Sequence, residues 1–395
     1  MKLNRTKLTR LADLLQEMVE TGFVAGVNCM VIQDGEEQCY YEAGFQDSAN
    51  RIPIARDTIF RLYSMTKPIT SAAVMMLLEE GKIDLLDPVC KYLPGFQNQY
   101  VVKNGMAVPV SRPVTIQNLL NMTSGLTYDG LNSATEILTG TLFQETAEKL
   151  HSAEALTTIE LMNRLGEIPL AFEPGTKWQY GASADVLGAI VEVVSGMRFG
   201  EFLEKRIFTP LGMKDTAFYV PEEKQPRLSK VYEETPDGLK AYYDSHLAVQ
   251  NRMEWNPAFE SGGAGLVSTI DDYAAFTQML LHNGSFRGVS LLSPKTVEFM
   301  TSAHLTPALQ SYVNQWESMP GYTYANLLRI MTRPDIAVSM GSQGEYGWDG
   351  WLGPYMTNDP ANRLTLLIMQ QRTGSGTTEY TRKIRNIVFS SLMTA

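Results

Sequence analysis

The strand-like segments of this chain lie near its two ends, and a long stretch with helical periodicity separates them. Strands are expected at residues 26–33, 36–43, 58–62, 346–351, 353–357 and 364–370. Amphipathic helices are predicted outside them, at residues 7–20 and from about Glu379 onward. This distribution predicts an α/β (α+β) fold, in which sequence-distant halves complete one antiparallel sheet and helices cover it.

The middle of the chain, residues 86–261, contains many glycines and prolines and few strand signals. Helical periodicity is found there around residues 116–121, 143–165 and 184–194. A strand signal returns near 263–267, and a helix that ends at Gly284 follows it. We therefore predict a sheet domain made of residues 1–85 and 262–395 and a helix-rich lobe made of residues 86–261, which carries Tyr180. The two would form one catalytic unit.

The composition is that of an ordinary globular protein, with 44% hydrophobic and 19% charged residues among 395. The net charge of −10 argues against nucleic acid or an anionic membrane surface as the main partner. No stretch approaches the ~20 apolar residues of a membrane span. The N-terminus has amphipathic periodicity instead of a signal-peptide pattern, so we expect a cytoplasmic protein.

The three cysteines exclude a disulfide-stapled scaffold and lack the spacing of zinc ligands. A two-residue turn signal at residues 34–35 lies between the first two predicted strands. Such a turn would place Cys39 opposite Met30, and Cys29 opposite Tyr40. The two thiols are therefore predicted to lie on opposite faces of the sheet, where they cannot form a disulfide.

The sequence lacks the signatures of several other enzyme classes. It contains no Gly-x-Ser-x-Gly nucleophile elbow, no P-loop and no dinucleotide fingerprint. Its four histidines have no spacing typical of metal ligands. Neither a metal nor a cofactor is expected.

The first candidate catalytic motif is Ser64-Met65-Thr66-Lys67, followed by Pro68. Because proline is tolerated only in the first turn of a helix, a helix is predicted to begin close to Ser64. The Ser64 hydroxyl would then lie near free backbone N–H groups, with Lys67 one turn later on the same face. A desolvated lysine loses its proton more easily and can act as a base. In the alternative interpretation, Ser64 only caps the helix and Lys67 is solvated.

Two further segments hold candidate site residues. Tyr180 shortly precedes Ser183, which is predicted to cap the next helix, so Tyr180 lies on a loop. It could transfer protons only beside a cation such as Lys67. Residues 346–353 are rich in glycine and aromatic side chains, and glycines in a strand indicate a bulge or a close approach to the backbone, for instance by a ligand. The alternatives are that Tyr180 only packs and that 346–353 is an aromatic hairpin.

Together these motifs resemble the serine β-lactamase-related hydrolases, specifically the class C β-lactamase-like group that includes the family VIII carboxylesterases. The resemblance extends from about residue 21 to residue 391. Trp348-Asp349-Gly350 stands at the place of the family's Lys-Thr-Gly strand motif. The other matching segments are residues 64–68, 122–126, 173–180, 210–216 and 261–266.

The resemblance implies a β-lactamase/transpeptidase-like fold, with an antiparallel sheet flanked by helices, a helix-rich lobe beside it and the active site between them. Ser64 would be the acylated nucleophile, and Lys67 and Tyr180 would share the work of the general base. The backbone N–H groups of Ser64 and Trp351 would form the oxyanion hole. The candidate substrate-binding residues are Trp348, Asp349, Gly350, Ala182 and Tyr128.

Two residues depart from the β-lactamase pattern. Ala182 replaces an asparagine that meets the amide side chain of the antibiotic, and Trp348 replaces the lysine that holds its carboxylate. A site that loses such polar contacts loses specificity for the groups they recognise. Arg372-Thr373-Gly374 resembles the missing motif, but it follows a predicted strand and is expected to lie in a loop.

The sequence therefore predicts a carboxylesterase-type serine hydrolase that cleaves small uncharged esters through an acyl-enzyme on Ser64. Transfer of the acyl group to an alcohol is a close alternative. A class C-like β-lactamase or D-peptide hydrolase is disfavoured by Ala182 and Trp348. A non-catalytic scaffold is disfavoured because Ser64, Lys67 and Tyr180 are all present.

Overall fold

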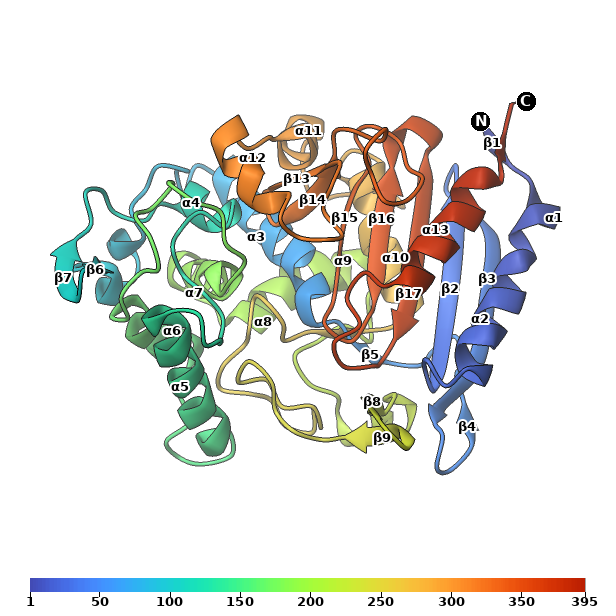
Figure 1. Cartoon of the computed structure of the whole chain (residues 1–395), viewed down its shortest axis with the longest axis horizontal. Coiled ribbons are helices and arrows are strands. Elements are labelled where there is room, and N and C mark those ends of the chain that lie inside the picture. The colour runs from blue at the N-terminus through green and yellow to red at the C-terminus, as the bar shows by residue number, and fades with distance from the viewer. Residues whose placement is uncertain (395) are drawn as a thin grey trace.

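The computed structural model describes residues 1–394. Its main feature is an eight-stranded antiparallel sheet with the strand order β13-β14-β15-β16-β17-β2-β3-β4 (Figure 1). Strand β17 from the end of the chain pairs with β2 from its beginning, so the prediction of one sheet completed by sequence-distant halves is confirmed. The strands are β2 (Gly26–Gln33), β3 (Glu36–Asp47), β4 (Ile52–Pro53), β13 (Tyr322–Ala325), β14 (Leu328–Met331), β15 (Tyr346–Asp349), β16 (Tyr355–Asp359) and β17 (Leu364–Gln370).

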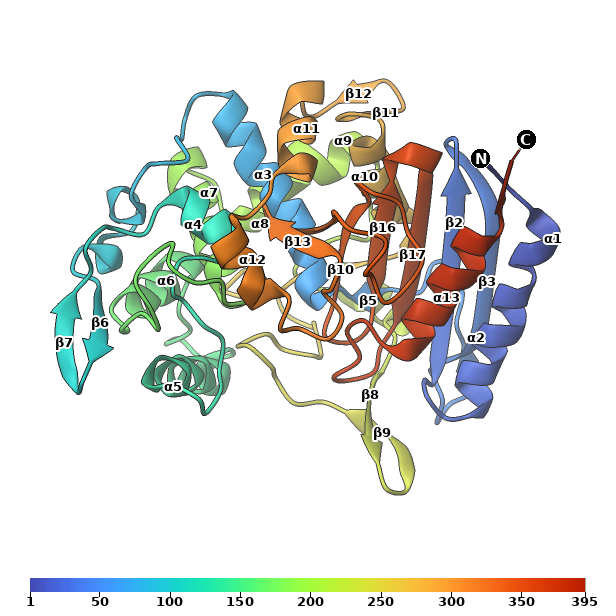
Figure 2. The ribbon, with the colours of Figure 1, turned by 45° about the horizontal axis from the view of Figure 1, so that its top comes forward.

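Helices cover the outer face of this sheet. The predicted terminal helices are found as α2 (Arg10–Glu20) and α13 (Glu379–Ser390), which lie beside each other on that face (Figure 2). Alternate residues of β2, Val27, Cys29 and Val31, pack in the core beneath them. The residues between, including Met30 and Ile32, belong to the core on the opposite face. The strand is therefore apolar on both faces, as expected of a sheet with helices on either side.

The inner face packs against α3 (Thr66–Glu79) and α10 (Ile270–Leu281). Residues 66–77 of α3 are all buried, which confirms the prediction of a central helix. A 3₁₀ turn, Tyr63–Met65, precedes α3, and Pro68 lies in its first turn. Gly81, with a φ of 65°, follows the end of the helix. The central position of α3 fixes the Ser64 turn between the sheet and the lobe.

The lobe differs in detail from its prediction. The single helix expected at residues 143–165 is two helices, α5 (Ala134–Lys149) and α6 (Thr158–Gly166), because Thr157 and Glu160 form a capping box that starts a new helix. Two hairpins were not predicted: β6 (Tyr100–Lys103) with β7 (Met106–Pro109), and β8 (Val231–Thr235) with β9 (Gly238–Tyr242). The domain boundaries at 86 and 262 stay a prediction. The other lobe helices are α4 (Ile116–Leu120), α7 (Ser183–Ser195), α8 (Phe199–Leu203) and α9 (Thr209–Leu211).

Short elements complete the structure. The strand expected at 263–267 is reduced to β10 (Val267–Ser268), which pairs with β5 (Phe60–Arg61), because residues 261–265 form a turn. Termini meet where β1 (Lys2–Leu3) pairs with β18 (Leu392–Met393) (Figure 1). The remaining elements are α1 (Arg5–Leu8), β11 (Ser285–Phe286), β12 (Val289–Ser290), α11 (Pro294–Ser302) and α12 (Pro307–Val313). Within residues 1–394, no helix has the length and apolar character needed to cross a bilayer.

The predicted register of the first hairpin is wrong. Cys29 pairs with Tyr41 and Val31 pairs with Cys39, because a β-bulge shifts the register between Val31 and Ile32. Both thiols therefore face the core under α2, on the same face of the sheet. Both cysteines are nevertheless free. Burial raises the pKa of the Cys29 thiol well above its usual range, as expected of an inert core residue.

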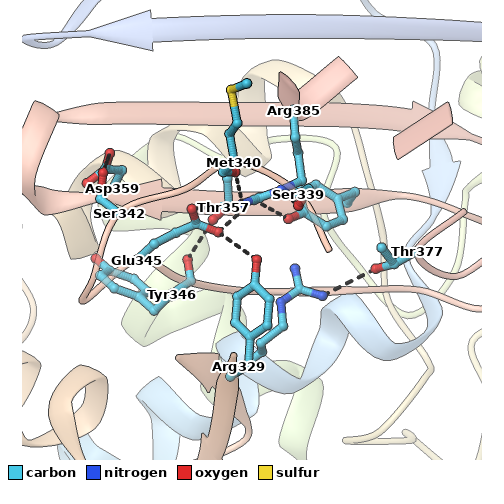
Figure 3. Close-up of polar contacts among 12 residues, drawn as sticks. Arg329, Ser339, Met340, Ser342, Glu345, Tyr346, Thr357, Asp359, Thr377 and Arg385 are labelled. Atoms are coloured by element: carbon cyan, nitrogen blue, oxygen red, sulfur yellow. Dashed lines mark hydrogen bonds and ion pairs between the residues drawn. The ribbon is translucent and has the colours of Figure 1, made fainter. Parts of the chain in front are cut away.

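A buried ion pair ties α13 to the sheet (Figure 3). Both terminal nitrogens of Arg385 donate to the Glu345 carboxylate, over 2.6 and 2.9 Å, and Nη1 also donates to the Tyr355 hydroxyl. Both charged side chains are 1% exposed. We expect Arg385→Met to lower the free energy of unfolding in urea by about 3–5 kcal/mol, because it leaves the Glu345 carboxylate buried without its partner.

The matched control is Lys383→Met, which removes an exposed charge pair with Glu379 on the same helix. We expect this variant to unfold with wild-type stability. Equal stability of the two variants would contradict a structural role for the buried pair.

Candidate active site

Ser64 lies in the 3₁₀ turn at the start of α3, with its side chain partly exposed. The preceding Tyr63 has a φ of 45°, a left-handed conformation that costs a non-glycine residue about 1–3 kcal/mol. Tertiary contacts hold it there: the Tyr63 hydroxyl donates to Asn251 Oδ1 over 2.9 Å, and the ring contacts Trp351. The strained turn therefore presents Ser64 at a fixed position between sheet and lobe.

Lys67 is buried and placed beside the serine. Its Nζ atom is 3.1 Å from Ser64 Oγ, 3.1 Å from the Tyr128 hydroxyl and 2.8 Å from the Gly263 carbonyl oxygen. Burial lowers the pKa of Lys67 to about 7, although the charges of Asp185 and Asp349 act in the opposite direction. The Lys67 amine is therefore neutral in a large fraction of the molecules at physiological pH.

Asp185 on α7 organises these contacts, and sequence reasoning missed it. Its carboxylate accepts from Ser261 Oγ over 2.5 Å and from the Gly263 N–H over 3.0 Å. It thereby fixes the turn whose Gly263 carbonyl contacts Lys67. The Tyr128 hydroxyl is 3.4 Å from the other carboxylate oxygen. The one signal in the sequence was its acidic side chain in a helix that is apolar apart from Asp185, Glu192 and its terminal serines.

The donors and acceptors around Lys67 determine how a neutral amine is oriented. An ionised Asp185 can only accept, so the Tyr128 hydroxyl donates to it and accepts from Lys67. The Gly263 carbonyl also only accepts. Two N–H bonds of the amine are then directed at Tyr128 and Gly263, and its lone pair is directed at the Ser64 hydroxyl.

Tyr180 approaches from the loop before α7. Its hydroxyl accepts a hydrogen bond from Trp348 Nε1 over 3.0 Å, and Lys67 Nζ lies 4.6 Å from the centre of its ring. Burial raises the pKa of Tyr180 well above 10, which outweighs the opposite effect of its hydrogen bonds with Ser64 and Trp348. The phenol is therefore neutral at pH 7.

The predicted cap after Tyr180 is wrong. Ser183 is the first residue of α7 and its hydroxyl is 2.8 Å from that of Ser124, so Ala182 takes the N-cap position without a side-chain hydrogen bond. Ala182 is fully buried. Its methyl group offers no amide to a ligand.

Strand β15 forms the other wall of the site. Trp348 packs with Tyr180 and Tyr324, at ring separations of 5.4 and 4.9 Å. Gly350 follows the strand, and a Cβ there would lie 2.2 Å from the Leu62 carbonyl oxygen, so only glycine lets the strand end approach the Ser64 turn. Trp351 stacks on His246 at 4.0 Å. The strand predicted to reach residue 351 ends at Asp349, because residues 350–354 form a turn in which the Gly350 N–H donates to the Pro354 carbonyl and the Gly353 N–H to the Gly350 carbonyl.

The N–H groups proposed for the oxyanion hole are available. Across residues 1–394, the backbone N–H groups of Ser64 and Trp351 have no protein acceptor, whereas that of Gly350 donates to the Pro354 carbonyl. Their joint role stays a prediction. Arg372 is engaged elsewhere: its guanidinium pairs with Glu234 and lies over the Phe23 ring.

Comparison with known proteins identifies the family. The family profile described as Beta-lactamase matches residues 11–388. The chain belongs to the beta-lactamase family. Among curated relatives, an uncharacterized protein of Mycobacterium tuberculosis is 31% identical over 90% of this chain and 88% of its own length. Esterase EstB of Burkholderia gladioli is 28% identical, with 93% of this chain and 91% of its own length covered.

Solved structures confirm the beta-lactamase-like fold. EstCE1, described as a hydrolase with promiscuous acyltransferase activity, superposes with a TM-score of 0.83 at 24% identity and covers 98% of this chain and 99% of its own. The simvastatin synthase LovD of Aspergillus terreus superposes with a TM-score of 0.79 at 22% identity, covering 98% and 99% of the two chains. The fold around Ser64 is therefore shared with both of these structures.

Proposed function

We propose that this beta-lactamase-fold serine hydrolase is a carboxylesterase that cleaves small uncharged esters through an acyl-enzyme on Ser64. The observation that carries the proposal is the position of the buried Lys67, whose Nζ atom lies 3.1 Å from Ser64 Oγ. Its two other contacts, with Tyr128 and Gly263, leave the lone pair of the neutral amine for the Ser64 proton. The surrounding walls support an uncharged substrate, because Ala182 provides no amide and Trp348 no cation. The similarity to esterase EstB agrees with this chemistry.

In the proposed acylation, neutral Lys67 takes the Ser64 proton as Oγ attacks the ester carbonyl carbon. The carbonyl oxygen becomes an oxyanion, and the N–H groups of Ser64 and Trp351 donate to it. When the intermediate collapses, the C–O bond to the alcohol breaks. Neutral Tyr180 gives its proton to the leaving oxygen and recovers one from the Lys67 ammonium, so Lys67 returns to its free-base form.

Deacylation repeats these transfers with water as the nucleophile. An alcohol could replace water in this step, which would make the product a new ester. EstCE1, which shares this fold, is described as having promiscuous acyltransferase activity, and this supports the alternative. The indole N–H of Trp348 would stabilise the Tyr180 oxygen while that oxygen lacks its proton.

The test compares p-nitrophenyl butyrate with a chromogenic cephalosporin. We expect ester turnover with little cephalosporin cleavage, and loss of turnover in step with modification of Ser64 by an alkyl fluorophosphonate, located by peptide mass spectrometry. Efficient cephalosporin cleavage would contradict the esterase assignment. A fluorophosphonate adduct on another residue would contradict Ser64 as the nucleophile.

The lowered pKa of Lys67 gives a pH dependence. Only the deprotonated amine can accept the Ser64 proton, so kcat/KM for p-nitrophenyl butyrate should rise with pH and level off above about 7. The neutral Tyr180 should cause no decline before its phenol ionises, well above pH 10. The measurement is kcat/KM between pH 5 and 9. A profile that is flat over this range, or that rises throughout it, would contradict Lys67 as the base.

The control for this profile is Asp185→Asn, which removes a negative charge that favours the ammonium form of Lys67. We expect the rise to move to lower pH. A variant that merely loosens the fold would lower the rate without moving the midpoint.

A further inference from the structure

Asp349 is a charged residue on the wall of the proposed site. It lies on β15 between Trp348, which contacts Tyr180, and Gly350, which packs against the Ser64 turn. Its side chain is 18% exposed. The negative charge of Asp349 raises the pKa of both Lys67 and Tyr180. Because Asp349 stands on β15 between a neighbour of Tyr180 and a neighbour of the Ser64 turn, a ligand bound at Ser64 would lie close to this carboxylate.

Arg329 is a cation buried behind Asp349. It lies on β14, its side chain is 3% exposed, and its Nη1 atom is 3.9 Å from Asp349 Oδ2. Thr377 bridges the two: its hydroxyl accepts from Arg329 Nη1 over 3.2 Å and donates to Asp349 (Figure 3 shows the Arg329 contact). The Nη2 atom of Arg329 has no hydrogen-bond partner within residues 1–394.

The surroundings of Arg329 explain why Asp349 matters. Aromatic rings of Tyr322, Tyr355 and Trp348 lie within 6 Å of the guanidinium, at 5.1, 5.0 and 5.8 Å. Asp349 is the carboxylate within 4 Å of it. Without Asp349, the charge of Arg329 would attract a carboxylate from a bound substrate. With Asp349 present, the positive charge of Arg329 is already paired with a carboxylate of the protein.

We propose that Asp349 is a specificity-determining residue that excludes esters with a carboxylate on the acyl chain, because it neutralises Arg329 and presents its own negative charge to the ligand. The inference rests on the esterase function proposed above. The site lacks the lysine that would attract a substrate carboxylate, because Trp348 takes its place. Asp349 in addition repels such a carboxylate, so anionic substrates are selected against in two ways. Neutral acyl groups remain acceptable.

The test compares two esters of similar length, p-nitrophenyl butyrate and the mono-p-nitrophenyl ester of glutaric acid, which carries a carboxylate. In the wild type we expect kcat/KM to favour the neutral ester. Asp349→Asn should reduce this preference about 10- to 100-fold, mainly by raising kcat/KM for the anionic ester. High salt should weaken the wild-type preference and affect the variant less.

Two controls isolate the charge. Asp13→Asn changes the net charge equally, but Asp13 is exposed on α2, on the outer face of the sheet, so the preference should stay as in the wild type. Adding Arg329→Met to Asp349→Asn should abolish the gain on the anionic ester. Asp349→Ser is the second variant if Asp349→Asn or the double variant does not fold.

A labelling readout separates this inference from the proposed function. The rate at which Ser64 reacts with a neutral alkyl fluorophosphonate, and with one that carries a terminal carboxylate, requires no ester turnover. A wild type that hydrolyses neither ester would overturn the proposed function, whereas the labelling rates would still decide the role of Asp349. A preference that stays within twofold in Asp349→Asn would overturn the inference. Failure of both reagents to label Ser64 would overturn both proposals.

Discussion

Replacing Ser64 by alanine is expected to lower kcat/KM for p-nitrophenyl butyrate by at least about a thousandfold. The reason is that every proposed covalent step passes through Ser64 Oγ, and no other hydroxyl is placed on Lys67 in the same way. The hydroxyl of Tyr128, which also contacts Lys67, donates its hydrogen bond to Asp185. Steady-state hydrolysis, corrected for the uncatalysed rate, gives the measurement.

The matched control is Ser71→Ala on the same helix. Ser71 is fully buried in α3, and its hydroxyl has no hydrogen-bond partner within residues 1–394. Its removal should leave hydrolysis at the wild-type rate. A large loss in this variant would mean that the Ser64→Ala effect reports damage to α3.

A double replacement shows whether Ser64 and Lys67 act as a unit. Lys67→Met should cost nearly as much as Ser64→Ala, and the two changes together should cost little more than either alone. Each single change removes the same proton transfer. Losses that multiply in the double variant would contradict the proposed role of Lys67, since it would then act independently of the serine.

The pairing of Ser64 with Lys67 could be predicted because it is local. The position of Pro68 fixes the start of the helix, and three residues of helix bring Lys67 to the Ser64 hydroxyl. The terminal helices and strands β2 and β17 were predicted for a similar reason, since the apolar pattern of each lies within a single segment. The protein family followed from the order of several such motifs.

Asp185 and Arg329 could not be predicted because their roles depend on contacts between distant segments. Asp185 on α7 acts through the turn at residues 261–263, and Arg329 acts through Thr377. In the sequence, each is one charged residue among many. Their significance comes from burial, which the local pattern does not show.

The β13–β14 hairpin was missed because its turn lacks the usual residues. Asn326 and Leu327 both have left-handed φ angles, 51° and 62°, where glycine is favoured at the second position. The Leu327 N–H donates to the Leu120 carbonyl over 2.8 Å, and its side chain is fully buried. Tertiary contacts therefore stabilise a turn that local propensity disfavours.

Replacing Tyr180 by phenylalanine is expected to lower kcat by about 10²- to 10⁴-fold for an alkyl butyrate. The phenylalanine ring keeps the packing against Trp348 and Trp316, at ring separations of 5.4 and 5.2 Å, and removes only the hydroxyl. The neutral phenol is suited to give a proton to the departing alcohol. A strongly basic alkoxide needs this proton, whereas p-nitrophenolate can leave without it.

The comparison of ethyl butyrate with p-nitrophenyl butyrate therefore separates two roles for Tyr180. If Tyr180 protonates the leaving group, the loss in Tyr180→Phe should be much larger for ethyl butyrate. If Tyr180 takes the first proton from Ser64, both esters should lose activity equally, because the attack on each requires the same deprotonation. Near-normal turnover of both would contradict any proton transfer by Tyr180.

Trp348→Phe provides the graded control for the same experiment. It keeps an aromatic ring beside Tyr180 and removes the indole N–H that donates to its hydroxyl. That donor stabilises the Tyr180 oxygen after it has given up its proton, so we expect a smaller loss, about tenfold, again concentrated on ethyl butyrate. An equal loss for both esters would show that Trp348 shapes the site without assisting proton transfer, and Tyr180 would then act without this hydrogen bond.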